Sequence, residues 1–161
     1  MLADQIDASP LELGDSLVVD NEASDRFSLL ASFAEDLPSL QTTSVYVNGD
    51  FAEENPGTVY AVVKAIVEQF REIDGNPEYL AGIAVEYAPD SVDAATVDEI
   101  AQKYVDLKMF PVNGGLNDDN LTYTAEFFGP DGTGSVDRVL ELDEFSDLSF
   151  LKEVLNELGV Q

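Results

Sequence analysis

Residues 55–75 read NPGTVYAVVKAIVEQFREIDG, and this stretch is the clearest guide to the fold. Asn55 and Pro56 are a typical helix start, because asparagine caps the first free N–H groups and proline suits the first helical position. Gly75 is a typical helix end. Between them the apolar residues recur at helical spacing and share one face: Val59, Val62, Val63, Ile66, Val67 and Phe70. The stretch therefore predicts a long amphipathic helix with one buried stripe.

Four more helices are expected downstream from the same kinds of signal. One starts at Asn76 and Pro77 and stops before Pro89, with Leu80, Ile83, Ala84 and Tyr87 inward. A second starts near Asp93, with Val97, Ile100, Ala101 and Tyr104 inward. A third starts near Asn117, with Leu121, Ala125 and Phe128 inward. The last starts near Ser146 or Asp147 and ends at Gly159, with Leu148, Leu151, Leu155 and Leu158 inward.

The front of the chain, residues 1–54, has a different character. Three short runs of β-branched or aromatic residues are bounded by turn-forming residues, which is typical of strands. They are SLVVD (residues 16–20), FSLLASF (27–33) and TTSVYV (42–47). No linker long enough to mark a domain boundary separates this strand-prone part from the helical part, residues 55–161. We therefore expect a single compact unit, residues 1–161, of the α/β class and rich in helix.

The charge of the chain is extreme, with 33 acidic residues against 7 Lys and Arg and a net charge of -26. Such a surface repels phosphate backbones and anionic lipid headgroups, so we expect no nucleic-acid partner and no binding to a membrane surface. The acidic residues are spread along the whole chain, whereas those of an acidic regulatory region cluster in blocks. We interpret the composition as the surface of a halophile's protein, whose self-repulsion is screened by molar salt.

The chain contains no Cys and no His. Disulfides, thiolate metal sites and the usual general base are therefore excluded, and we expect neither an enzyme nor a bound cofactor or metal. PDGTGSVD (residues 130–137) spaces oxygen atoms like the opening of a calcium loop but lacks the closing Glu, so we interpret it as a turn. The start, MLADQIDASPLELG, has neither the basic residues nor the apolar run of a signal peptide, so we expect no export signal in the chain as written.

A turn of unusual composition, FPVNGGLNDDNL (residues 110–121), joins two of the expected helices. Pro111 pushes the preceding residue out of helical geometry, and Gly114 and Gly115 can adopt the positive φ that other residues resist. Asn117 and the residue after it then start the next helix. Only Asn113 has a side chain that the turn does not require, which makes its amide a candidate for contacting a ligand.

Four stretches in a fixed order resemble the C-terminal half of a known family. They are YVNGDFAEENPGTVYAVVKAIVEQF, NPEYLAGIAVEYAP, FPVNGGLNDDNLTYTAEFF and DLSFLKEVLNELG. This order is similar to that of the NMT1/THI5-like family of ABC-transporter substrate-binding proteins, relatives of the sulfonate, nitrate and pyrimidine binding proteins. The resemblance extends from roughly Leu30 to Gly159 and implies half of a type II periplasmic-binding-protein-like fold. It also implies a small-molecule ligand, an ABC permease as the partner of the full-length protein, and an extracytoplasmic, membrane-associated location for it.

If the chain forms a ligand pocket, Thr42, Thr43 and Tyr46 at a strand end and the amide of Asn113 are the best candidates. They combine hydrogen-bonding groups with an aromatic face, which suits a small polar ring or a sulfonate. One alternative is a degenerate remnant of the family that acts as a self-associating structural or interaction protein. Another is the family's thiamine-pyrimidine synthase, which consumes one of its own histidines and a lysine-bound pyridoxal phosphate. The absence of His disfavours that alternative.

The resemblance covers only half of a family member, and this implies an uncovered surface. Segments that pack against partner strands expose apolar surface and unpaired backbone edges when those strands are absent. A symmetric dimer is the simplest closed arrangement that covers such a surface. We therefore expect a homodimer that associates through the front third of the chain.

Overall fold

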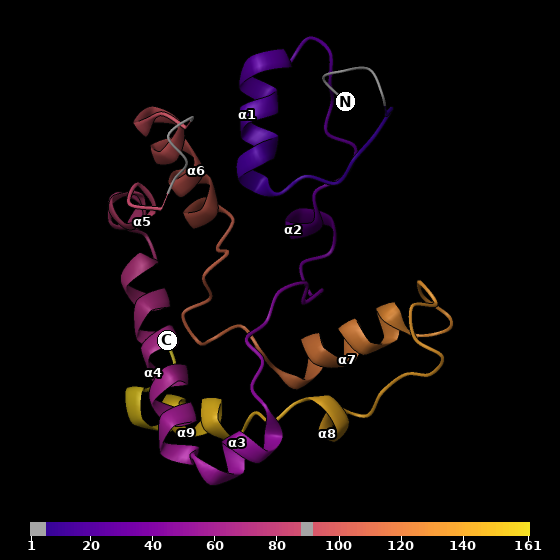
Figure 1. The fold of residues 1–161 in the computed structure, drawn as a ribbon, viewed down its shortest axis with the longest axis vertical. Coiled ribbons are helices and arrows are strands. Elements are labelled where there is room, and N and C mark those ends of the chain that lie inside the picture. The colour runs from indigo at the N-terminus through magenta and orange to yellow at the C-terminus, as the bar shows by residue number, and fades with distance from the viewer. Residues whose placement is uncertain (1–5, 88–91) are drawn as a thin grey trace.

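The computed structural model describes residues 6–87 and 92–161 (Figure 1). This part of the chain is rich in helix and contains no β-strand. The helices are α1 (Leu13–Ala23), α2 (Phe33–Asp36), α3 (Gly49–Glu54), α4 (Pro56–Ile73), α5 (Pro77–Ala84), α6 (Ala94–Asp106), α7 (Asp118–Phe128), α8 (Leu142–Phe145) and α9 (Ser149–Leu158).

The strand predictions for the front of the chain are wrong within the described residues. Residues 16–20 lie inside α1, which packs against α6: a Cβ built at Gly14 would lie 3.5 Å from Ile100 Cδ1. This packing outweighs a β preference that is weak and depends on context. Residues 27–32 are irregular, and α2 begins at Phe33. Residues 42–47 belong to no helix or strand, because no neighbouring segment pairs with them.

The predicted helix starts are confirmed. Pro56 opens α4 directly after Asn55, but the side chain of Asn55 makes no capping bond and its Nδ2 donates instead to the carbonyl of Phe51. The side-chain oxygens of Asn76, Asp93 and Asn117 each accept a hydrogen bond from a backbone N–H three residues on, at 3.3, 3.0 and 2.9 Å. Each of these bonds satisfies an N–H that the helix itself leaves free. The stretch 129–142 forms turns and bends and then the start of α8.

The larger core lies where α9 packs across α4, at the lower left of Figure 1. Its centre is formed by Val67, Leu151 and Val154, and the side chains of Val67 and Val154 are almost fully buried. Each such side chain stabilises the fold by about 1.5–3 kcal/mol. The sequence did not single out Val154, and it wrongly placed Val62 inward. Val62 is 46% exposed because α9 covers only part of the apolar stripe of α4.

A polar cluster closes the exposed side of this core. Glu157 on α9 accepts hydrogen bonds from the Tyr60 hydroxyl and the Lys64 ammonium, both on α4. The hydrogen bond from Lys64 and then that from Tyr60 hold the pKa of the Glu157 carboxyl below its usual value. The same contact raises the pKa of Lys64. The pair is partly exposed, so it orients α9 on α4 more than it stabilises the fold.

The smaller core joins α5 to α6 through Ala81, Val97 and Ala101. Small side chains at this contact let the two helices approach closely. Ile83 and Tyr87 were expected to point inward, but they are 37% and 81% exposed. Leu80 and Ala84, which were also expected to point inward, do pack against this core, so α5 contacts α6 through the side that carries Leu80, Ala81 and Ala84 and leaves Ile83 and Tyr87 exposed.

The chain exposes an unusually large surface for its mass. Its accessible area is 11124 Å², whereas a compact monomer of 17.5 kDa has about 7,900 Å², an excess of roughly 3,200 Å². Figure 1 shows one reason, since the irregular segment between α2 and α3 crosses the molecule without a helix or strand of its own. Many large apolar side chains therefore remain in contact with water.

Candidate functional site

A hollow of about 430 Å³ lies at the Pro-Val-Asn-Gly turn. The end of α4, the segment after α6, the start of α7 and one residue of α9 surround it. Its polar lining comes from Asp74, Lys108, Asn113 and Asn117, and Phe110 contributes an aromatic face. The hollow therefore combines one cation, one anion, two amides and an aromatic ring.

The turn that lines this hollow has the backbone geometry that the sequence predicts. Gly114 and Gly115 have φ values of 80° and 78°, which are strained for any residue with a side chain. A Cβ on Gly114 would lie 2.7 Å from Leu151 Cδ1, and one on Gly115 would lie 2.5 Å from Pro111 Cγ. The N–H of Gly114 donates to the carbonyl of Pro111 at 2.8 Å. Both glycines are thus required by conformation and by packing.

Arg71, in the last turn of α4, fixes the turn to the end of α9. Its Nε donates to the carbonyl of Val112 at 2.9 Å, and its Nη2 donates to the carbonyl of Gly159 at 2.6 Å. Longer bonds reach the carbonyl of Leu158 at 3.3 Å and the side-chain oxygen of Asn113 at 3.4 Å. All four acceptors are neutral, but two are carbonyls at a helix C-terminus, where the helix dipole favours a cation.

Asn113 is engaged in structure as well as lining the hollow. Its Oδ1 accepts from the N–H of Gln161 at 3.1 Å, and its Nδ2 donates to the carbonyl of Gln161 at 2.8 Å. Together with Arg71, this amide holds the chain end against the turn. The role of its side chain, which the turn itself does not explain, is thus accounted for by a contact 48 residues away.

The other predicted ligand residues lie on the surface. Thr42, Thr43 and Tyr46 are exposed, and Tyr46 is 86% exposed. The segment is tied to α7 just before them, where the N–H of Gln41 donates to Thr124 Oγ1 at 2.9 Å. The hydrogen bonds of Asn113 go to Arg71 and Gln161, and no described contact joins it to residues 42–46.

Lys108 is the residue of the hollow that the sequence did not reveal. It follows the end of α6 with φ 51°, the one positive φ of a non-glycine residue in the described ranges. Its N–H donates to the carbonyl of Val105, and the next N–H donates to the carbonyl of Tyr104, both at 3.0 Å. Backbone strain of this kind at a non-glycine residue occurs often at functional sites. A lysine two residues before the turn of residues 110–121 was the available signal.

Phe110, which lines the hollow, belongs to an aromatic cluster. The ring of Phe110 lies 5.5 Å from that of Phe70 and 5.9 Å from that of Tyr104, measured between centroids. Burial raises the pKa of the Tyr104 hydroxyl. These contacts connect α4, α6 and the turn, so the hollow rests on side chains that are fixed by packing.

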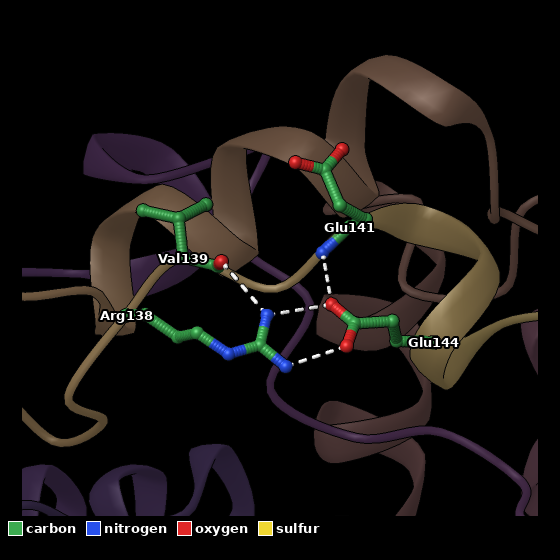
Figure 2. A network of polar contacts seen from close by, with 4 residues as sticks. All are labelled: Arg138, Val139, Glu141 and Glu144. Carbon is green, nitrogen blue, oxygen red and sulfur yellow. Dashed lines mark hydrogen bonds and ion pairs between the residues drawn. The ribbon is translucent and has the colours of Figure 1, made fainter.

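Figure 2 shows a second polar network, on the loop that follows α7. Arg138 Nη1 donates to Glu144 Oε2 at 2.7 Å, and the N–H of Glu141 donates to the same oxygen at 2.8 Å. These bonds, with that from Arg138 the stronger, lower the pKa of the Glu144 carboxyl to about 2. Arg138 and Glu144 are both partly exposed, and Glu144 forms the capping box of α8 with Glu141, so we interpret the network as structural.

Two searches for other kinds of site give negative results for the described ranges. No cluster of three acidic side chains is arranged to hold a metal ion in residues 6–87 and 92–161. In the same ranges no helix has the length and apolar character needed to cross a bilayer.

Comparison with known proteins adds no relatives. No family model matches the chain, and neither a curated protein nor a solved structure is significantly similar to it.

Proposed function

We propose that the chain is the C-terminal part of the solute-binding component of an ABC importer for a small polar organic ligand, from a halophile. In this proposal it contributes half of an α/β, type II periplasmic-binding-protein-like fold, and other segments supply the strands. The full-length protein would act outside the cytoplasm and deliver its ligand to an ABC permease. The observation that carries the proposal is the hollow at the Pro-Val-Asn-Gly turn, which lies within one of the resembling stretches.

The chemistry of the hollow suits a small organic anion such as a sulfonate. Its volume is within the range of roughly 300–1,000 Å³ that is usual for ligand sites. The ammonium of Lys108 can pair with an anionic group, and the amide of Asn117 can add hydrogen bonds. Phe110 offers an apolar surface to the rest of the ligand. Molar salt would screen the net charge of -26, which otherwise repels an anion.

One observation favours a second candidate, the self-associating remnant. The exposed area in excess of a compact monomer fits a protein whose surface is completed by another chain. An enzyme has no comparable support. A pyridoxal-phosphate enzyme would need a lysine that forms an imine with the cofactor, and only four side chains of the chain could do so: Lys64, Lys103, Lys108 and Lys152.

Calorimetric titration with ethanesulfonate in molar KCl tests the proposal. We expect saturable binding that is weakened about tenfold or more by Lys108→Gln, because one charge-assisted hydrogen bond is worth about 1.5–3 kcal/mol. Lys103→Gln is the matched control, since Lys103 is exposed on α6 and does not line the hollow. Equal affinity in the two variants would contradict the role given to the hollow.

A further inference from the structure

The longest run without a charged residue is residues 37–49, which covers much of the connecting segment between α2 and α3. We call it the neutral segment. Elsewhere one residue in four is charged, so this run stands out in a chain of net charge -26. Between Arg26 and Asp50 only two residues are charged, Glu35 and Asp36. Depletion of charge with retention of aromatic and apolar residues is typical of the centre of a protein interface.

Three consecutive apolar side chains of the neutral segment are exposed to solvent. Val45 is 72% exposed, Tyr46 is 86% exposed and Val47 is 51% exposed. The preceding run adds three more exposed residues: Leu29, Leu30 and Phe33. Single exposed apolar residues are normal on a protein surface, whereas three consecutive exposed apolar residues such as Val45, Tyr46 and Val47 favour an interaction site.

The backbone of residues 42–47 is also free to pair. Within the described residues none of its N–H or C=O groups takes part in a backbone hydrogen bond of a turn, helix or strand. The sequence TTSVYV is rich in residues that favour strands. An exposed segment of this kind is a template on which another chain can add a strand.

We propose that this segment is the interface with a second copy of the chain, which pairs with it as an antiparallel strand centred on Val45. The net charge of the chain is the reason for proposing a second copy as the partner. Two copies of charge -26 repel each other over most of their surfaces, and the neutral segment is where they can meet with least repulsion. A basic partner would instead bind to the acidic surface. Self-pairing about Val45 places Thr43 opposite Val47 on the same face of the two strands.

The exposed surface of the whole chain is large enough to include a dimer interface. The excess of roughly 3,200 Å² over a compact monomer exceeds the roughly 800 Å² that each partner buries in an interface of standard size. A two-fold axis makes the interface close on itself, so the association stops at two copies. The inference is independent of solute binding, since none of its residues lines the hollow.

Cysteine cross-linking tests the proposal directly, because the chain has no Cys of its own. Opposed residues of antiparallel strands lie about 4.5–5.5 Å apart at Cα, within the span of a disulfide. We therefore expect Val45→Cys to form a covalent dimer under mild oxidation in molar KCl. Val160→Cys is the matched control, since Val160 has a similar exposure of 75% at the other end of the chain. Equal cross-linking of the two variants would overturn the proposal.

Light scattering of the unmodified chain gives the second measurement. The expected mass in molar KCl is near twice 17.5 kDa, and Val45→Lys should weaken the dimer about tenfold or more by opposing two like charges. Val160→Lys should leave the mass unchanged. A monomer at high concentration, or a dimer that Val45→Lys does not weaken, would overturn the proposal. The proposal would also be overturned if the chain associated only with an unrelated strand-forming peptide and not with a second copy of itself.

Discussion

Arg71 should be the most important single side chain for holding the C-terminal end of the protein in place. It makes two short hydrogen bonds, to the carbonyls of Val112 and Gly159 at 2.9 and 2.6 Å, and two longer ones. A hydrogen bond that involves a charged group contributes about 1.5–3 kcal/mol, and partial exposure lowers that contribution. If we count only the two short bonds, Arg71→Ala should cost about 2–4 kcal/mol in the free energy of unfolding.

The assay is urea unfolding followed by circular dichroism in molar KCl, because urea leaves the ionic strength constant. Arg71→Lys keeps the charge but loses the planar fork, so it should still lose at least half of that free energy. Arg138→Ala is the control, since it removes an exposed surface pair with Glu144, and such pairs contribute little to stability. A cost of Arg71→Ala no greater than that of Arg138→Ala would refute the role assigned to Arg71.

Four further outcomes are expected. Gly114→Ala should destabilise the fold by about 1–3 kcal/mol through positive-φ strain and the contact with Leu151. Gly57→Ala, where nothing lies within 4 Å of the added Cβ, should be neutral or slightly stabilising. Equal effects of the two substitutions in urea unfolding would contradict this prediction. The pKa of Glu144, about 2 in the folded state, lies below its ordinary value of 4.5, so the contact with Arg138 stabilises the fold above pH 4.5 and this contribution is lost as the pH falls toward 2. Carboxyl NMR titration should show the pKa of Glu144 returning toward 4.5 in Arg138→Gln, and an unchanged value would rule out the ion pair as its main cause. The helical circular dichroism signal should weaken as salt falls from molar to tens of millimolar levels, and a constant signal would contradict the halophilic interpretation. Mass spectrometry after borohydride reduction should find no pyridoxal phosphate on any lysine, and such an adduct would reopen the enzyme hypothesis.

Local signals in the sequence predicted the helical part well. The starts of α4, α5, α6 and α7 depend on a capping residue and its immediate neighbours, and such signals are complete within a few residues. The positive φ of Gly114 and Gly115 was predictable for the same reason.

Long-range contacts account for what the sequence did not predict. Arg71 binds carbonyls 41 and 88 residues away, and the amide of Asn113 reaches Gln161 across 48 residues. The inward placement of Val62 and Tyr87 failed because burial depends on which neighbour covers a helix face, not on apolar character alone. The strand expected at residues 16–20 became part of α1 for a similar reason, because α6 packs against it.

The binding of a small anion at the Pro-Val-Asn-Gly turn is tested most directly by mapping amide chemical shifts while ethanesulfonate is added in molar KCl. We predict saturable shifts confined to residues 108–117, Asp74 and Leu155, which include the whole lining of the hollow, and no shift in the neutral segment. No saturable shift in this range, or shifts that centre on Thr42, Thr43 and Tyr46 instead, would contradict the account.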